Sequence, residues 1–186
     1  MIIPVKGARQ ASKSRFGPGD HRDLALAMAL DTVAAALVVA PVVVVTVGGA
    51  EFQSLGARVV QDAGLGLNAA IQSGLAVVDG STTGTVALLA DHPALQPTEL
   101  REALAAAEEF ERSMVADSDG SGTALVAARA GVGHDLAFGA NSRAAHRARG
   151  YVELDGGWPG LRRDIDVPDH FGGLNLGPRT LEFVQR

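Results

Sequence analysis

The strongest constraint on the fold of this chain is a set of short, almost wholly apolar segments that alternate with longer helical patterns. Pro41–Thr46 is a run of valines, and Thr85–Ala90 is a second apolar run of similar length. Continuous apolar runs of this kind are typical of strands that are covered on both faces. Between the strands, Leu24–Leu37 and Leu67–Val78 carry apolar residues at helical spacing. The alternation predicts an α/β fold with a mostly parallel sheet and helices on both of its faces.

The remaining elements follow the same alternation. Further strands are expected at Ile2–Val5, Arg58–Gln61, Ser113–Ala116 and Ala124–Ala127, and further helices at Thr98–Phe110, Arg143–Arg149 and Thr180–Val184. No internal repeat or linker divides the chain, so we expect a single domain over residues 1–186. In such sheets ligands bind beyond the carboxyl ends of the strands, which makes the residues that follow each strand the candidates for a site.

Composition excludes several classes of protein. The chain has 186 residues and no cysteine, which rules out a disulfide scaffold, a thiol nucleophile and a cysteine-containing zinc site. Its net charge of −5 argues against a nucleic-acid partner, because such proteins normally carry a basic surface. The longest apolar run, Leu37–Val47, contains Pro41 and falls well short of the roughly 20 residues of a membrane-spanning helix. With no secretory leader at Met1, we expect a cytoplasmic protein without a membrane partner.

A basic loop follows the first expected strand. The segment Gly7–Ser14 resembles a P-loop, but Ser12 stands where that motif requires glycine. The loop nevertheless places Lys6, Lys13 and Arg15 close to a strand end, where cationic side chains suit a polyphosphate. The alternative is a solvated loop with scattered charges.

A glycine-rich turn, Gly64–Ala69, follows the strand at Arg58–Gln61 and opens the next helix. It fits the pattern G-x-G-x-x-A, in which backbone N–H groups and a helix N-terminus receive an anion. The dinucleotide-binding pattern expects this turn after the first strand, so the segment indicates a nucleotide contact rather than an NAD fold. A tight strand-to-helix turn with no ligand is the alternative.

Three carboxylates are candidates for a metal site. Asp91 directly follows the apolar strand Thr85–Ala90. Asp164 and Asp166 are two residues apart, so both point to one face if the segment is extended. Two negative charges at such a short distance repel each other unless a cation or solvent screens them. Oxygen ligands of this kind favour Mg²⁺. The alternatives are a helix cap for Asp91 and an exposed acidic turn for the later pair.

Two polar loops complete the set of candidate segments. Asp117–Thr123 offers small hydroxyls and backbone N–H groups between two strands, and Phe138–Ser142 opens the basic helix. Ser142 could cap this helix or help to bind an anion at its N-terminus. The histidines show no zinc-binding spacing and no serine lies in a G-x-S-x-G elbow, so neither a histidine-ligated metal nor a hydrolase triad is expected.

Taken in order, these segments resemble the CofC/FbiD guanylyltransferases. The matching segments are Ile3–Lys6 with Ala11–Arg15, Asp62–Asn68, Leu89–Leu95, Asp117–Thr123, Phe138–Ser142 with His146, and Leu161–Pro168. The resemblance spans Ile2 to Phe171, nearly the whole chain. Because that family resembles the MobA-like nucleotidyltransferases, it implies a three-layer α/β/α sandwich of the GT-A-like, Rossmann-like type.

The resemblance also implies an activity. Members of the family transfer GMP from GTP to a small phosphorylated three-carbon acid and release pyrophosphate, in biosynthesis of the deazaflavin coenzyme F-420. The alanine- and arginine-rich composition resembles that of actinobacterial members of the family. That resemblance implies phosphoenolpyruvate as the acceptor, with 2-phospholactate and 3-phosphoglycerate as alternatives. A downstream transferase could receive the product. The rival functions are a MobA-like or sugar-phosphate nucleotidyltransferase, whose usual Gly-Gly-x-Ser-x-Arg first loop is missing here, and a non-catalytic nucleotide-binding regulator.

The resemblance assigns roles to individual residues, which fall into four groups. The expected Mg²⁺ ligands are Asp91, Asp164 and Asp166; the acceptor contacts are Thr123, Gly139 and Ser142; the triphosphate contacts are Lys6, Lys13, Ser14 and Arg15; and the guanosine contacts are Gly66 and Asn68. Asp91, Lys13 and Arg15 are the expected catalytic residues. The departures from the family pattern are His92, Ser121, Ala124 and the absence of an acid at Val47–Gly49.

Overall fold

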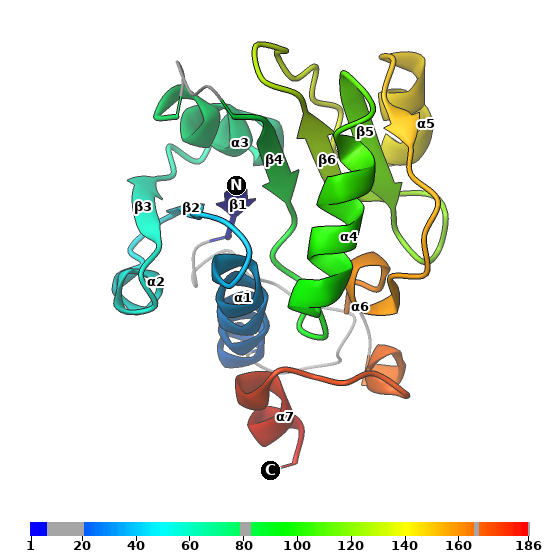
Figure 1. Ribbon diagram of the computed structural model, residues 1–186. Helices are drawn as coiled ribbons and strands as arrows, with labels where there is room; N and C mark the ends of the chain where they lie inside the picture. The colour runs from blue at the N-terminus through cyan, green and yellow to red at the C-terminus, as the bar shows by residue number, and fades with distance from the viewer. Residues whose placement is uncertain (7–20, 79–82, 166–167, 186) are drawn as a thin grey trace.

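A computed structural model describes residues 1–6, 21–78, 83–165 and 168–185 (Figure 1). Its centre is a seven-stranded sheet with the order β3-β2-β1-β4-β6-β5-β7. The strands are β1 (Ile2–Pro4), β2 (Val43–Thr46), β3 (Arg58–Gln61), β4 (Thr85–Leu88), β5 (Arg112–Ala116), β6 (Thr123–Ala128) and β7 (Val152–Glu153). The helices are α1 (Arg22–Leu37), α2 (Ala50–Ser54), α3 (Leu67–Ala76), α4 (Pro97–Ala107), α5 (Ser142–Ala148), α6 (Pro159–Arg162) and α7 (Pro178–Val184), with a 3-10 turn at Pro168–Phe171.

The sheet is mostly parallel, as predicted. Strands β3, β2, β1 and β4 run parallel to one another, and β7 is parallel to β5. Only β6 is reversed, because it pairs antiparallel with both β4 and β5. The carboxyl ends of β1 to β5 therefore meet the amino end of β6 along one edge of the sheet, where the candidate site residues are expected.

Two apolar cores cover the two faces of the sheet, which confirms the three-layer arrangement. Alternate residues of the first strands divide between them: Ile3 and Val44 pack with α1 and α4, whereas Ile2 and Val45 pack with α3. In Figure 1, α1 and α4 lie in front of the sheet and α3 behind it. All four strand residues are completely buried, which explains why these strands read as continuous apolar runs.

Helix α3 approaches the sheet more closely than an ordinary side chain would allow. A Cβ atom at Gly74 would overlap the side chain of Ile2 and lie 2.9 Å from Val45 Cγ2. The glycine thus lets the helix backbone rest directly on β1 and β2, and it fixes the height of α3 above the sheet.

Several short elements differ from the sequence-based expectation. Helices α2 and α6 and strand β7 were not among the elements expected from the sequence, because elements of two to five residues show no hydrophobic period. The cap expected at Ser142 is wrong: Asn141, with φ of 56°, occupies the N-cap position and Ser142 is the first helical residue of α5. Asp91 does not cap α4 either, since Gln96 is the N-cap of that helix.

A buried carboxylate fastens α7 to the body of the protein. Asp31 lies in the middle of α1, and its side chain is only 1% exposed. Its oxygens accept hydrogen bonds from the backbone N–H groups of Thr180, at 2.8 Å, and Arg179, at 3.3 Å, at the start of α7. The N–H of Gly177 also donates to the carbonyl oxygen of Pro93. Helix α7 is therefore anchored both to α1 and to the turn that follows β4.

Replacing Asp31 by alanine should loosen α7, because two backbone N–H groups would lose a charged acceptor. Such bonds contribute about 1.5–3 kcal/mol each when measured by deletion, so we expect a fall of at least this size in the free energy of unfolding, measured in urea. Asp23→Ala, at an exposed position in the first turn of the same helix, should change it by less than about 1 kcal/mol. Equal effects of the two substitutions would contradict the anchoring role.

No helix within the described part of the chain is both long and apolar enough to cross a membrane.

Candidate active site

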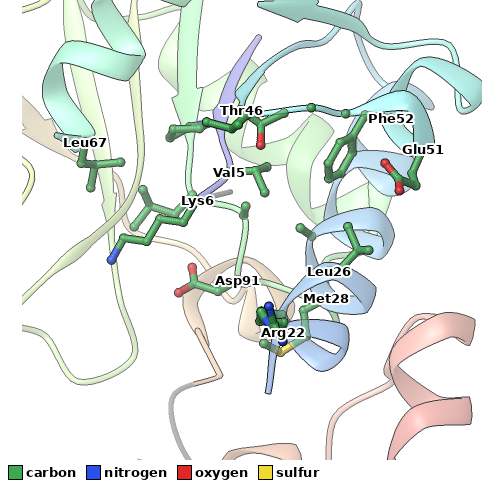
Figure 2. A pocket seen from close by; sticks show the side chains of 18 residues that line it. Val5, Lys6, Arg22, Leu26, Met28, Thr46, Glu51, Phe52, Leu67 and Asp91 are labelled. Carbon is green, nitrogen blue, oxygen red and sulfur yellow. The ribbon is translucent and has the colours of Figure 1, made fainter. Parts of the chain in front are cut away.

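A cavity of about 420 Å³ opens at the carboxyl edge of the sheet (Figure 2). The ends of β1, β2 and β4 form one side, and the first turns of α1 form the other. Its charged lining residues are Lys6, Arg22, Glu51 and Asp91. Lys6 and Arg22 stand on either side of residues 7–20 in the sequence, the stretch that contains the predicted basic loop. Lys13, Ser14 and Arg15 themselves lie outside the described residues, and their role stays a prediction.

The segment after β2 forms part of the cavity wall, and its side chains were not among the predicted contacts. Gly48 and Gly49 both adopt positive φ, 93° and 104°, and turn the chain directly from β2 into α2. A Cβ atom at Gly49 would lie 2.9 Å from Thr46 Cγ2. The turn brings Thr46 and Glu51 to the cavity. The signal in the sequence was the glycine pair at a strand end.

Asp91 begins the turn that leaves β4 at the cavity. Its side chain is 31% exposed, whereas that of His92 is completely buried, with Nε2 3.9 Å from Asp91 Oδ1. The hydroxyl of Thr32, on α1, lies 3.1 Å from the carbonyl oxygen of Ala90 and 2.9 Å from that of Met28, so its one proton is shared between the two. Leu95 N donates to the carbonyl oxygen of His92. The turn is thus held by a contact from α1 and by a hydrogen bond between its own residues, so the position of the carboxylate does not depend on the loop alone.

Backbone contacts bring the second predicted carboxylate to the same place. The N–H of Ile165 donates to the carbonyl oxygen of Asp91 at 3.1 Å, which lays the Asp164 segment beside the β4 turn. On its other side, His170 Nδ1 lies 3.0 Å from the carbonyl oxygen of Asp164. Asp166 lies outside the described residues, and the described ones contain no cluster of three metal-binding side chains. The segments that carry Asp91 and Asp164, two residues of the type that Mg²⁺ prefers, therefore lie side by side at this edge.

Helix α6, which directly precedes the Asp164 segment, is held in place by hydrogen bonds to α4. Glu99, in the first turn of α4, accepts a hydrogen bond from the N–H of Gly160 at 3.1 Å, and Glu102 accepts one from the indole of Trp158 at 3.0 Å. A side chain at Gly160 would overlap the carbonyl oxygen of Ala94. Helix α6 therefore packs tightly against the residues that follow the Asp91 turn.

The predicted acceptor residues lie next to this carboxylate edge. Leu89 N donates to the carbonyl oxygen of Ala124 at 3.1 Å, which places Thr123, the first residue of β6, beside the end of β4. Ser142 N donates to the carbonyl oxygen of Gly139, and a Cβ atom at Gly122 would lie 3.8 Å from Ser142 Oγ. Thr123, Gly139 and Ser142 thus belong to one cluster of neighbouring loops.

Arg143 ties the two loops of this cluster together. Its Nη1 donates to the carbonyl oxygen of Gly120 at 2.9 Å, and its Nε forms an ion pair with Glu153 on β7 at 2.9 Å. Asp117 Oδ1 accepts a hydrogen bond from the N–H of Ser121 within the same loop. The loop 117–122 is consequently fixed to the start of α5.

Asn68, a predicted guanosine contact, makes a structural bond within the protein. Its Oδ1 accepts from Phe138 N at 3.0 Å, and its Nδ2 donates to Phe138 O at 2.9 Å. The side chain thus joins the start of α3 to the acceptor loop. Gly66 is the N-cap of α3, with φ of 97°, and lies exposed beside it. Nucleotide contacts at Gly66 and Asn68 stay predictions.

Two histidines to which the sequence assigned no role connect the acceptor loop to the sheet. His134 Nε2 lies 3.1 Å from Thr85 Oγ1, and its Nδ1 lies 3.1 Å from the hydroxyl of Tyr151. His146 Nδ1 lies 3.0 Å from Thr123 Oγ1. Burial lowers the pKa of both imidazoles to about 4, helped by the charge of Arg112 near His134 and of Arg149 near His146. Both rings are therefore neutral near pH 7.

Residues 22–157 match the family model of the MobA-like NTP transferase domain. The chain belongs to this family. The site described above thus lies in a nucleotidyltransferase, and the family membership confirms the GT-A-like fold expected from the sequence.

Within the MobA-like family, this chain is similar to curated proteins named phosphoenolpyruvate guanylyltransferase. The relative from Thermomonospora curvata is 46% identical over 201 residues, which cover 100% of this chain and 88% of that protein. The relative from Mycobacterium sp. (strain KMS) is 48% identical over 199 residues, covering 99% of this chain and 90% of the relative. The suspected resemblance to the CofC/FbiD guanylyltransferases is confirmed.

Solved structures share the fold of this MobA-like protein at lower identity. A nucleotidyl transferase from Methanothermobacter thermautotroptrophicus superimposes with a TM-score of 0.60 and 23% identity, covering 92% of this chain and 94% of the other. Rv0371c from Mycobacterium tuberculosis, in complex with manganese, gives a TM-score of 0.54 and 20% identity, covering 91% and 94%. At these identities the likeness concerns the fold alone.

The two neutral histidines should make this transferase less stable in mild acid. In the unfolded chain a histidine takes up its proton near pH 6.5, whereas the folded rings do so only near pH 4. Their contribution to stability is thus complete above about pH 6.5 and is lost as the pH falls toward 4. We expect the unfolding temperature to fall between pH 7.5 and pH 5.

Glutamine substitutions provide the control for this pH dependence. His134→Gln together with His146→Gln removes both titrating rings and should flatten the change in unfolding temperature between pH 7.5 and pH 5. An equally steep change in the double variant would mean that other groups cause the loss.

Proposed function

We propose that this protein transfers GMP from GTP to phosphoenolpyruvate and releases pyrophosphate, a step in biosynthesis of the deazaflavin coenzyme F-420. The observation that carries the proposal is the 46–48% identity to phosphoenolpyruvate guanylyltransferases over essentially the whole chain. The geometry agrees with it, because a cavity with cationic lining residues lies beside two carboxylates and a loop cluster with hydroxyl groups.

The reaction brings two anions together, and the residues at the carboxyl edge suit that task. A phosphate oxygen of the acceptor attacks the α-phosphorus of GTP, and the bond to the leaving pyrophosphate breaks. The acceptor phosphate is already ionised near pH 7, so no general base is required. Lys6 and Arg22 would attract the triphosphate to the cavity, with Lys13, Ser14 and Arg15 contributing from the basic loop.

The carboxylates Asp91 and Asp164, with Asp166, are the residues that would hold a divalent ion, which we take to be Mg²⁺. Their oxygen donors are of the kind that ion prefers, and the backbone bond from Ile165 N to Asp91 O, which joins the first two segments, supports the assignment. When bound, such an ion supplies neutralising charge for the phosphates of both substrates. The carboxylates themselves fix its place relative to the cavity.

The acceptor acid would lie over the loop cluster next to Asp91. Thr123 and Ser142 offer hydroxyl groups, and Gly139 leaves its backbone open to a ligand. Gly66 and Asn68, across Phe138, would face the guanosine. The substrates are thus GTP and a phosphorylated three-carbon acid, and a downstream transferase that takes the activated product is the expected partner in the cytoplasm.

Pyrophosphate release tests the proposal directly. GTP should support turnover with phosphoenolpyruvate better than with 2-phospholactate or 3-phosphoglycerate, and ATP or CTP should not replace GTP. No release with GTP and any of the three acids would refute the proposed transfer.

Asp91→Asn should abolish this activity while the fold remains. The substitution keeps the shape of the side chain but removes its charge, so we expect kcat/KM to fall at least about 100-fold, the order seen when a charge-stabilising group is lost. Glu109→Gln, an exposed acid beyond the end of α4, is the matched control and should match the wild type. Unfolding temperatures of both variants show whether the fold is preserved. Normal GMP transfer by Asp91→Asn would contradict the assignment.

A further inference from the structure

A buried hydrogen-bond chain fixes the proton of one acceptor hydroxyl. Ala137 N lies 2.9 Å from His146 Nε2. Because a backbone N–H can only donate, Nε2 must accept with its lone pair, and the proton of the neutral ring sits on Nδ1. That Nδ1 lies 3.0 Å from Thr123 Oγ1. The backbone carbonyl of Ser142, one turn earlier in α5, is a second acceptor for this ring N–H. The ring N–H therefore donates toward Thr123 Oγ1 and Ser142 O, and in its contact with the ring the threonine oxygen can only accept.

This direction leaves the hydroxyl proton of Thr123 available. In the described part of the structure, His146 is the one hydrogen-bond partner of the threonine side chain. With the opposite tautomer, Thr123 would donate to the ring and present only lone pairs to its surroundings. Lone pairs repel an anion, whereas an O–H group donates to it.

We propose that His146 is a positioning residue that orients the Thr123 hydroxyl as a hydrogen-bond donor to the acceptor acid. The inference rests on the proposed function, which places a phosphorylated carboxylic acid over Thr123. His146 itself is completely buried and would not touch the substrate. It acts through Thr123, and it would favour an anionic ligand over a neutral one.

The surroundings of His146 hold the ring in this one orientation. Phe138 and Tyr151 contact it edge-on, with ring centroids at 4.9 Å and 5.1 Å. The residue before Phe138, Ala137, supplies the N–H that selects the tautomer, and Asn68 clamps the backbone of Phe138 from the other side. The charged groups that act on the ring are Arg149 and Asp135, and the low pKa of about 4 keeps it neutral at working pH.

Two amide substitutions separate the two bonds of His146. In His146→Asn, the amide nitrogen takes the place of Nδ1 and can still donate to Thr123. In His146→Gln, the amide oxygen takes the place of Nε2 and can still accept from Ala137, but nothing donates to Thr123. We expect the KM for phosphoenolpyruvate to rise about tenfold in His146→Gln, the loss of roughly one hydrogen bond. In His146→Asn it should stay within about threefold, with the KM for GTP unchanged in both.

Thr123→Val and its combination with His146→Gln show whether the effect passes through the hydroxyl. Once the hydroxyl is absent, the histidine substitution should raise the KM for phosphoenolpyruvate no further. His134→Gln is the matched control: it alters a half-buried histidine with a similarly lowered pKa that does not contact Thr123, so it should lower stability without changing this KM. Long-range ¹H–¹⁵N NMR of the wild type should show the proton of His146 on Nδ1.

Each outcome decides the matter. Three results would overturn the role of His146 while leaving the transferase activity in place. The first is an equal rise in the KM for GTP and for phosphoenolpyruvate that accompanies a fall in unfolding temperature. The others are an unchanged KM for phosphoenolpyruvate in His146→Gln and a proton on Nε2. A wild-type protein that releases no pyrophosphate with GTP and the acids would overturn the proposed function, and this inference with it.

Discussion

The backbone hydrogen bond from Ile165 to Asp91 is the contact on which the candidate site depends. It joins the end of a central strand to a segment more than seventy positions later in the chain. Two other anchors keep that later segment in place: Glu99 binds the start of α6, and Asp31 binds the start of α7. In all three contacts an oxygen of Asp31, Asp91 or Glu99 accepts from a backbone N–H of the segment that begins at Gly160. The C-terminal segment is consequently a structural part of the site.

The reversed strand β6 has a comparable effect on the other side of Asp91. In a purely parallel sheet, the residue beside the end of β4 would be the end of another strand. Because β6 runs the other way, its first residue, Thr123, stands there instead. The loop that precedes β6 and the start of α5 then gather around that residue, held by Arg143. The antiparallel strand thus brings loop 117–122 and the start of α5 to the same edge as the carboxyl ends of the parallel strands.

Much of this architecture could be predicted because it depends on local patterns. The apolar runs identified β2 and β4, and the bounds of β3 were predicted as Arg58–Gln61. Asp91 could be singled out since it follows a buried strand. Asp31, by contrast, looked like an interruption of an apolar helix, because its partners in α7 lie about 150 positions away. Long-range bonds of this kind leave no period in the sequence.

The same limit applies to the side chains around the acceptor loop. Asn68 and His146 stood in segments that the resemblance brought out, yet the bonds they make to Phe138, Ala137 and Thr123 depend on how separate loops meet in space. Helix α2 and strand β7 were missed because they are too short to carry a period. Sequence reasoning therefore located the edge of the site, while the contacts that hold its parts together became visible only in three dimensions.

The contact of Gly74 with β1 and β2 limits which sequences this fold can accept. Any larger residue at this position would lift α3 away from the sheet, since Ile2 and Val45 fill the space below it. The start of α3 carries both the Gly66 turn and the Asn68 clamp on Phe138. A change in helix packing on the far side of the sheet would thus move a wall of the site. Replacing a helical glycine by alanine usually stabilises a helix, but at Gly74 this substitution would push the helix away from the sheet.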